Sequence, residues 1–167
     1  TRVHRLCFNP EKAEPVRRSI IEQSGNKAIE IMQVDLCSLA SVNRLAEELL
    51  QRNVAIDLLT NNAGTLDPRH IETTDGLART TSVNYVAPYL LTRKLLPLMH
   101  RGSRIVNMVS CTYAIGRIDL PDFFARGRKG TFWRIPIYSN TKLALTLFTL
   151  ELADRLKEQG IAVNASD

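Results

Sequence analysis

The sequence is poor in three features that would each have assigned it to a class of protein. Aromatic residues make up only 6% of its 167 positions, and cysteine occurs three times, at Cys7, Cys37 and Cys111. An odd number of cysteines without metal or redox spacing argues against a disulfide framework and a metal centre, so we expect reduced, mostly buried thiols. No run approaches the roughly 20 apolar residues of a membrane-spanning helix. The first residues carry charge where a signal peptide would be apolar, and we expect a cytoplasmic protein.

What is present is enough for one ordinary folded domain. Hydrophobic residues make up 44% of the chain and charged residues 23%, which excludes an intrinsically disordered protein. The 22 Lys and Arg residues exceed the 17 Asp and Glu residues, for a net charge of +5, but most of these charges are scattered as on a solvated surface. A basic cluster at residues 126–134 lacks a recognisable nucleic-acid-binding module, and we expect no nucleic acid partner.

Strand-like and helix-like segments alternate along the chain. Strands are predicted at residues 3–7, 28–34, 56–60, 103–109 and 161–164, and helices at about 10–24, 80–100 and 138–159. Asn9 and Pro10 predict the start of the first helix, and Gly25 predicts its end. A further helix is predicted to begin after a cap at either Ser38 or Ser41, with an apolar stripe of Val42, Leu45, Ala46, Leu49 and Leu50. Strands separated by helices, with little hairpin chemistry, indicate parallel βαβ units. The predicted fold class is therefore α/β, with a doubly wound parallel sheet between two helical layers. Ligands bind at the carboxyl ends of the strands in such sheets.

Tyr138 and Lys142 are four positions apart in a segment that is predicted to be helical. Residues at this spacing project from one face of a helix, one turn apart. An ammonium beside a phenol stabilises the phenolate, which allows a tyrosine to exchange a proton with a substrate oxygen near neutral pH. For this pair taken alone, a partly buried tyrosine beside a surface lysine stays open as the alternative.

Three further polar positions follow strands or interrupt a helix. Asn61-Asn62-Ala63-Gly64 ends an apolar strand; its small residues let backbone approach a ligand, and its amides either tie neighbouring strands or bind ribose. Ser110 follows the next strand, either as a turn or cap residue or as a hydroxyl beside the ligand. Asn84 lies in a predicted helix, where asparagine is intrinsically poor and indicates a local hydrogen bond.

Taken in order, these motifs resemble the short-chain dehydrogenase/reductase family. The ordered motifs are Asn61-Asn62-Ala63-Gly64, Asn84, Ser110, and Tyr138 with Lys142. Asp35 and Leu36, after the second predicted strand, also match the family's adenine-side position. Each motif is weak by itself, and their shared order along essentially the whole chain carries the resemblance. It implies a Rossmann-like, three-layer αβα fold and a single domain over residues 1–167.

The resemblance also implies a role for each residue. Tyr138 would be the general acid in carbonyl reduction and the base in the reverse reaction. Lys142 would lower the pKa of Tyr138 and hydrogen-bond the nicotinamide ribose. Both residues would border the cofactor. Ser110 would hold the substrate oxygen, and Asn84 would position a water in a proton relay. The adenosine side of the cofactor would be lined by Asp35, Leu36, Asn61, Ala63 and Gly64.

Two departures from the family pattern stand out. Ser110 and Tyr138 are 28 positions apart (138 − 110 = 28), more than is usual in the family. The insertion resembles a loop of the retinol-dehydrogenase-like branch, and it forms either an apolar substrate wall or a loop packed on its own aromatics. The family's first strand and its glycine-rich phosphate-binding turn do not occur in the sequence. We expect a domain that is incomplete at both ends, with two strands left unpaired beside the missing central strand.

The implied activity is that of an NAD(P)-dependent oxidoreductase, which moves a hydride between a nicotinamide cofactor and a small or lipophilic carbonyl or alcohol. The residues after the first strand, Cys7-Phe8-Asn9, offer no acid for the ribose of NAD, whereas Lys12 could meet a 2′-phosphate, so NADP is favoured over NAD. No metal is expected. The alternative function is that of a truncated, catalytically impaired homologue acting as a binding or regulatory module.

The helix predicted at residues 138–159 is apolar on two faces, so it is expected to be covered on two sides. The sheet would cover one face. Either the helix that contains Asn84 or a second subunit would cover the other, and a homodimer or tetramer is one expectation.

Overall fold

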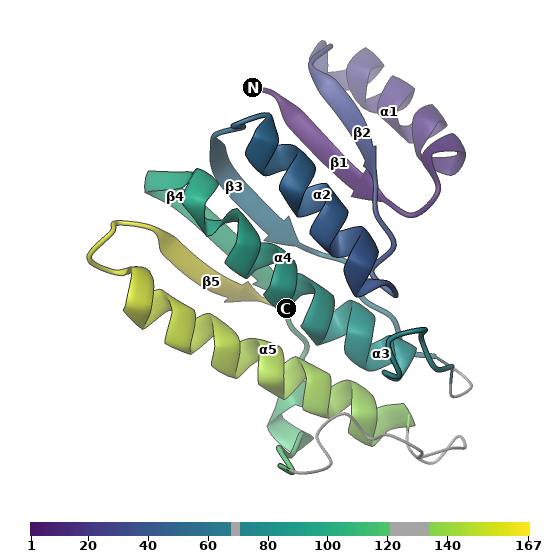
Figure 1. Cartoon of the computed structure of the whole chain (residues 1–167), viewed down its shortest axis with the longest axis vertical. Coiled ribbons are helices and arrows are strands. Elements are labelled where there is room, and N and C mark those ends of the chain that lie inside the picture. Colours follow the sequence, from purple (N-terminus) through teal and green to yellow (C-terminus); the bar gives the residue numbers. More distant parts are fainter. Residues whose placement is uncertain (68–70, 121–133) are drawn as a thin grey trace.

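The computed structural model describes residues 1–67, 71–120 and 134–167, and within them five parallel strands alternate with helices (Figure 1). The strands are β1 (Val3–Cys7), β2 (Ile29–Gln33), β3 (Ile56–Asn61), β4 (Met99–Met108) and β5 (Ala162–Ser166). The α-helices are α1 (Pro10–Ser24), α2 (Leu39–Gln51), α3 (Arg79–Thr81), α4 (Ala87–Leu95) and α5 (Arg134–Leu156). The shorter turns are η1 (Ser82–Val86), η2 (Leu96–Leu98) and η3 (Cys111–Ile115). The predicted α/β class with parallel strands is confirmed.

The strands form two sheets with a break between them. β1 pairs with β2, and β3, β4 and β5 pair in that order, all in parallel. No pairing joins β1 to β3 among the described residues. α1 lies behind the strands and α2, α4 and α5 lie in front of them, which gives three layers (Figure 1).

The first helices begin and end where the sequence predicted. Asn9 caps α1 by accepting a hydrogen bond from the Lys12 backbone N–H at 3.0 Å, and Pro10 occupies the first position, where its missing N–H costs nothing. Gly25 ends α1 in the left-handed conformation, with φ 70°. Ser38 caps α2, as one of the two predicted alternatives. These local signals place the carboxyl ends of β1 and β2 beside each other.

The core lies between the strands and the front helices. α2 contributes the predicted stripe, of which Val42, Leu45, Ala46 and Leu49 are buried and Leu50 is partly buried. The stripe packs in one cluster with α4, α5 and the inward faces of β3, β4 and β5. The fully buried Ile105 of β4 lies at the centre of that packing. This cluster holds the front layer rigidly against the strand ends.

Three sequence predictions need correction. The helix predicted at 80–100 ends at Leu95 and β4 already begins at Met99, because Pro97 has no N–H with which to continue the helix. α5 begins at Arg134 and ends at Leu156, so it starts and stops earlier than predicted. The thiols are not mostly buried, since Cys111 is exposed and the other two are partly exposed. The insertion between Ser110 and Tyr138 falls largely on residues 121–133, outside the described residues.

The described part of the chain has neither a membrane-spanning helix nor a cluster of metal-ligating side chains. None of its helices combines the length and the apolar character needed to cross a membrane. No three of its His, Cys, Asp and Glu side chains lie together in a way that could hold a metal ion.

Candidate active site

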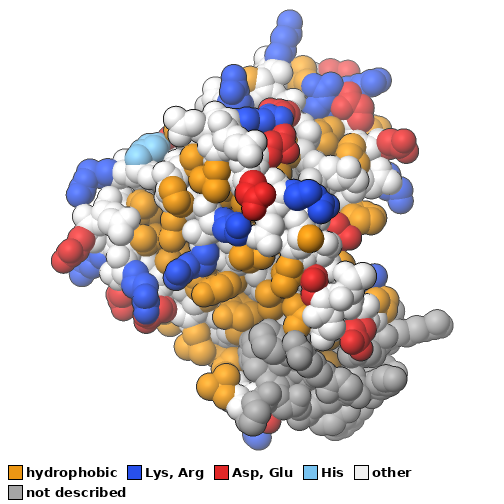
Figure 2. All heavy atoms as spheres, viewed as in Figure 1, with side chains coloured by type: hydrophobic (Ala, Val, Ile, Leu, Met, Phe, Trp, Pro, Cys, Tyr) orange, Lys and Arg blue, Asp and Glu red, His pale blue; other side chains and the backbone are white. Residues whose placement is uncertain are grey.

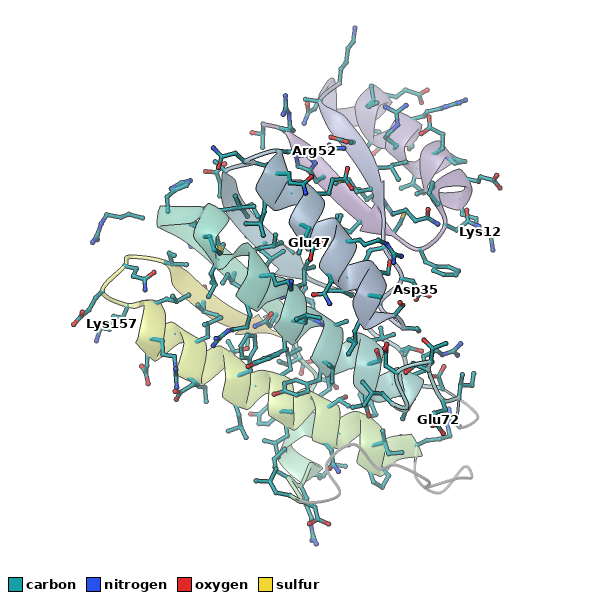
Figure 3. All side chains as sticks on the ribbon, in the orientation of Figure 1. Lys12, Asp35, Glu47, Arg52, Glu72 and Lys157 are labelled. Carbon is teal, nitrogen blue, oxygen red and sulfur yellow. The ribbon has the colours of Figure 1, made fainter. Side chains whose placement is uncertain are left out.

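The predicted site residues follow the carboxyl ends of the strands. Asp35 comes after β2, Ser110 comes after β4, and β3 ends at Asn61, with Ala63 and Gly64 just beyond it. All strands are parallel, so these ends lie along one edge of the two sheets. Figure 3 shows Asp35 and Lys12 at this edge, close to where β1 and β2 end. The topology therefore assembles residues that are far apart in the sequence.

Lys142 is the most buried charged group at this edge. Its side chain is only 3% exposed, and its Nζ donates a hydrogen bond to the backbone carbonyl of Met108 at 2.7 Å. Burial lowers the pKa of Lys142, and the charge of Asp167 opposes that shift. The Nζ atom also lies 5.6 Å from the centre of the Tyr138 ring. The alternative of a surface lysine without a partner is therefore wrong.

Ser110 is brought to the same place by the packing of η3 against α5. Ser110 follows Met108 by two residues and caps η3, accepting hydrogen bonds from the N–H and the hydroxyl of Thr112. η3 ends at Gly116, where an added Cβ would lie 2.5 Å from the Ser139 carbonyl oxygen. Only a residue without a side chain permits this close approach to α5. Ser110 therefore follows the end of β4, where Lys142 binds the Met108 carbonyl, and the Tyr138 ring lies beside the Lys142 ammonium.

Asn84 holds the loop after β3 against the helices. Its Oδ1 accepts from the Thr65 N–H at 2.7 Å, and its Nδ2 donates to the Thr65 carbonyl at 2.9 Å and to Thr141 at 3.4 Å. The residue lies in the π-helical turn η1, and its side chain is 1% exposed. An asparagine in a predicted helix indicated a local hydrogen bond, and these contacts confirm that prediction. Its role in positioning a water stays a prediction.

Asn61 and Gly64 have different surroundings. The Asn61 amide donates to Thr92 at 2.9 Å and to Asn107 of β4 at 2.7 Å, which matches the first of its two alternatives, the tying of neighbouring strands. At Gly64 an added Cβ would lie 3.6 Å from Lys142 Nζ. A glycine at this position therefore keeps one side of the ammonium open. A cofactor-binding role for either residue stays a prediction.

Asp35, Leu36 and Ala63 lie together at the end of a groove between β1 and β3. The Asp35 carboxylate accepts from the Cys37 N–H at 2.8 Å, and the Leu36 carbonyl accepts from the Ser82 hydroxyl at 2.7 Å. These bonds hold the turn after β2 in place. Asn61 lines the same groove, so the structure brings four of the five predicted adenosine-side residues to one surface.

One buried ion pair near the site was not predicted from the sequence. The Arg79 guanidinium donates to both carboxylate oxygens of Asp67, and Asp67 also accepts from the hydroxyls of Thr65 and Thr80 at 3.2 Å. Arg134, the first residue of α5, donates from Nε to the Asp67 carbonyl at 2.8 Å. The pair therefore links the loop after β3 to the helix that carries Tyr138. No spacing signal connects these residues, because only the fold brings them together.

The ion pair predicts a specific acid sensitivity. Burial alone would raise the pKa of Asp67, but the hydrogen bond and the charge of Arg79 outweigh it and hold the pKa below its ordinary value. A lowered folded-state pKa stabilises the fold above the unfolded value of about 3.9, and this stability is lost as pH falls through the folded value. We expect R79Q to lower the free energy of unfolding at pH 7 by about 2 kcal/mol, less than for a fully buried pair because Arg79 is partly exposed.

Urea unfolding at pH 7 and pH 3 measures this effect. In R79Q the difference in stability between the two pH values should shrink, because the Asp67 carboxylate has lost the partner that lowers its pKa. The matched control is R155Q, which breaks an exposed pair between Arg155 and Glu151 and should change neither value measurably. Equal losses of unfolding free energy in R79Q and R155Q would contradict the stabilising role assigned to the pair of Asp67 and Arg79.

Comparison with known proteins identifies the family. A family model described as enoyl-(acyl carrier protein) reductase matches residues 3–122, which is most of the chain. The chain belongs to the short-chain dehydrogenase/reductase family. This agrees with the resemblance carried by the ordered motifs and with the parallel fold. The residues after each strand of this dehydrogenase/reductase chain are therefore its candidate active site.

Similar proteins include a retinol dehydrogenase and a polyprenol dehydrogenase. Human retinol dehydrogenase 13 is 34% identical over 161 residues, 95% of this chain and 48% of the relative. Mouse polyprenol dehydrogenase is also 34% identical, over 93% of this chain and 47% of its own length. The chain spans about half the length of the curated relatives that it matches.

Solved structures agree with the fold. The promiscuous reductase LugOII, which catalyses keto-reduction at C1 during lugdunomycin biosynthesis, is 28% identical with a TM-score of 0.71, over 98% of this chain and 65% of that one. A short-chain dehydrogenase from Burkholderia cenocepacia, in complex with NADP, is 26% identical with a TM-score of 0.71, over 98% and 62% of the two chains. The Rossmann-like architecture is thus confirmed by relatives that share the family.

The residues present fit the nicotinamide half of such a cofactor. The Lys142 ammonium has three N–H donors, of which the described contacts use one, on the Met108 carbonyl. The glycine at position 64 leaves room beside that ammonium. Lys142 would hold the nicotinamide ribose, and Ser110 and Tyr138 would face the substrate oxygen.

Proposed function

We propose that this chain carries the proton-transfer half of an NAD(P)-dependent oxidoreductase that interconverts carbonyls and alcohols. The observation that carries the proposal is the buried Lys142 ammonium, held by the Met108 carbonyl and placed 5.6 Å from the Tyr138 ring. A charge buried at the edge where ligands bind, beside a phenol, is expensive unless it serves chemistry. The family membership of the chain supports the same conclusion.

The chain's own residues would manage the proton and the orientation of the substrate. When bound, a nicotinamide cofactor supplies the hydride that forms the new C–H bond. As that bond forms and the carbonyl π bond breaks, the Tyr138 hydroxyl gives its proton to the substrate oxygen. Lys142 stabilises the phenolate that is left, and Ser110 orients the substrate oxygen by a hydrogen bond. In the alcohol-oxidising direction, the same groups act in reverse.

We propose NADP rather than NAD as the preferred cofactor. Lys12 lies in the first turn of α1, beside the end of β1, where its cation and the helix N-terminus both favour an anion such as a 2′-phosphate (Figure 3). The residues that follow β1, Phe8 and Asn9, include no carboxylate that would grip the ribose of NAD. The NADP complex of the Burkholderia cenocepacia relative supports a nicotinamide cofactor in general.

For the substrate we propose a small or lipophilic carbonyl or alcohol. Two relatives, retinol dehydrogenase 13 and polyprenol dehydrogenase, support the lipophilic class by their names.

We also propose that the protein forms homodimers through α4 and α5. Figure 2 shows hydrophobic side chains gathered over these two helices. Leu147 and Leu150 of α5 are 48% and 61% exposed, and the exposed Tyr89 of α4 packs its ring against Phe148 of α5. Contiguous apolar patches of this kind mark interaction surfaces. Light scattering tests the proposal, and a monomer at micromolar concentration would exclude it.

A cytoplasmic location remains our proposal. The three cysteines form no disulfide, which supports a reducing compartment. Fractionation of cells that express the tagged whole protein tests the location, and recovery in a secreted fraction would overturn it.

The function is tested by an assay of the whole protein with a lipophilic aldehyde such as decanal. We expect aldehyde-dependent oxidation of NADPH, with kcat/KM at least about tenfold higher than with NADH, because one charged contact to the 2′-phosphate contributes on the order of 1.5–3 kcal/mol. No aldehyde-dependent oxidation with either cofactor would overturn the enzyme proposal and favour the binding or regulatory module. Equal efficiency with both cofactors would overturn only the preference for NADP.

A further inference from the structure

Arg134 begins α5 and lies one helical turn before Tyr138. Its Nε donates a hydrogen bond to the backbone carbonyl of Asp67 at 2.8 Å. In an α-helix the N–H of each residue bonds to the carbonyl four positions earlier, which pairs residue 138 with residue 134. The contact that holds Arg134 therefore also helps to place the Tyr138 side chain.

The other end of the pair formed by Tyr138 and Lys142 has a separate anchor. Lys142 is buried, and its Nζ donates to the Met108 carbonyl of β4 at 2.7 Å. Tyr138 lies between that anchor and the start of the helix. The N–H groups of a first helical turn lack partners within the helix, so a helix end opens more readily than its middle. A second anchor at Arg134 holds the segment that carries Tyr138 from both sides.

Asp67 is a firm support for this second anchor. The residue is only 5% exposed, and its carboxylate accepts hydrogen bonds from Arg79 Nε at 3.0 Å. It also accepts from the hydroxyls of Thr65 and Thr80 at 3.2 Å. Thr65 lies in the loop after β3, whereas Arg79 and Thr80 belong to α3, so the Asp67 side chain is held from two elements. With its side chain held, the backbone carbonyl of Asp67 keeps its direction toward Arg134.

The same contacts extend to Asn84. The Asn84 amide binds both the N–H and the carbonyl of Thr65, whose hydroxyl donates to Asp67. Figure 1 shows α3 beside the first turns of α5, and residues of the two helices contact each other. A continuous series of hydrogen bonds therefore runs from Asn84 through the loop after β3 to the start of α5.

Stability alone is a weak explanation for the buried pair of Asp67 and Arg79. Taking two charges out of water costs about as much free energy as their attraction contributes, so a buried ion pair is weak evidence for a stabilising role. The loss of stability expected for R79Q has another cause, because that variant leaves the Asp67 charge without its partner. A directed carbonyl at the start of α5 explains the pair better.

We propose that Arg134, Asp67 and Arg79 act as one positioning unit that holds the Tyr138 hydroxyl where it can reach the substrate oxygen. This proposal rests on the proposed oxidoreductase function. The three residues act through Tyr138, so they are positioning residues rather than catalytic ones. A displacement of about 1 Å in a reacting group can cost up to about 100-fold in rate, so the unit controls turnover.

The first test compares R134M with R134K in the whole protein, by steady-state kinetics with decanal and NADPH. Methionine keeps the apolar stem of the side chain but has no donor, whereas lysine keeps a donor and the charge. We expect R134M to lower kcat about tenfold with KM for NADPH within about twofold, and R134K to restore kcat to within about threefold of the parent value.

Circular dichroism checks that both variants are folded. The matched control is R155M, which removes an exposed arginine of α5 that pairs with Glu151 and should leave kcat within about twofold. A kcat of R134K as low as that of R134M would overturn the proposal, as would an unchanged kcat in R134M.

A double variant tests whether the three residues act as one unit. R79Q releases the Asp67 side chain, and R134M removes the donor to the Asp67 carbonyl. We expect each single variant to lose about tenfold in kcat and R79Q/R134M to lose about the same, because effects of residues that act as a unit do not add. A loss of about 100-fold in the double variant, the product of the two single losses, would show independent effects and overturn the unit.

Fluorine NMR of protein labelled with 3-fluorotyrosine measures the placement of Tyr138 without turnover. The Tyr138 signal is assigned by its absence from Y138F. We expect R134M to shift this signal by more than its linewidth and to leave the Tyr89 signal unchanged, whereas R155M should shift neither. An active protein whose Tyr138 signal does not shift in R134M would overturn only the positioning unit. A protein that shows the shift but reduces no aldehyde would instead contradict the oxidoreductase proposal.

Discussion

Y138F in the whole protein is expected to reduce aldehyde turnover by about 10³-fold while the affinity for NADPH stays within about twofold. Removing a general acid typically costs 10²- to 10⁴-fold in rate, and Tyr138 is the only proposed donor of the proton. The ring of phenylalanine keeps the contact with the Lys142 ammonium, whose Nζ lies 5.6 Å from the ring centre. The packing of α5 therefore stays the same, and only the hydroxyl is lost.

Steady-state kinetics and cofactor titration by fluorescence measure the two quantities separately. The matched control is Y89F, which removes a hydroxyl from an exposed tyrosine of α4 that packs its ring against Phe148. We expect Y89F to retain turnover within about twofold, because surface changes of this kind have small effects. Normal turnover by Y138F would remove Tyr138 from the chemistry, whereas lost cofactor binding would indicate a structural role.

K142M is expected to lose at least about 100-fold in turnover without a comparable loss of stability. The ammonium is buried at a cost, and burial lowers the pKa of Lys142. Methionine fills nearly the same space without a charge, so the unfolding free energy at pH 7 should fall by no more than about 1 kcal/mol, the worth of the bond to Met108. A lysine that served only stability would show the opposite result, a large loss of unfolding free energy with little loss of turnover.

The pH dependence of stability separates this prediction from a simple loss of packing. Because the folded-state pKa of Lys142 is lowered, the unfolded chain binds more protons between that value and about 10.4, so the parent chain should gain stability as pH rises through this window. K142M should lose that gain. Urea unfolding at pH 7 and at higher pH measures this gain in unfolding free energy. The control is K157M, which changes an exposed lysine at the far end of α5 (Figure 3) and should keep the gain.

Local signals in the sequence were enough to predict most elements of the fold. The cap at Asn9, the left-handed glycine at Gly25 and the apolar stripe of α2 all depend on neighbours within a few residues, and all are confirmed. The helix predicted at residues 80–100 was too long because its amphipathic pattern continues past the point where Pro97 ends it. Element boundaries depend on single backbone groups, which a periodicity does not resolve.

The candidate site was predicted only in part. The spacing of Tyr138 and Lys142 predicted that they lie one turn apart. It did not predict that Lys142 is buried against a carbonyl of β4, since that depends on how α5 packs. The two alternatives for Asn61 could be separated only by its contacts with β4 and α4. Asp67 and Arg79 were missed because neither lies in a motif.

By itself, the sequence determined the alternation of strands and helices, the parallel class and the order of the motifs, because these depend on local periodicity and on residue types at given positions. Only the tertiary structure decided which groups meet. The buried ammonium beside the phenol, the Asp67–Arg79 pair and the groove between β1 and β3 all join segments that are distant in the chain. Such contacts arise when packed layers bring strand ends to one edge, and no short stretch of sequence contains them.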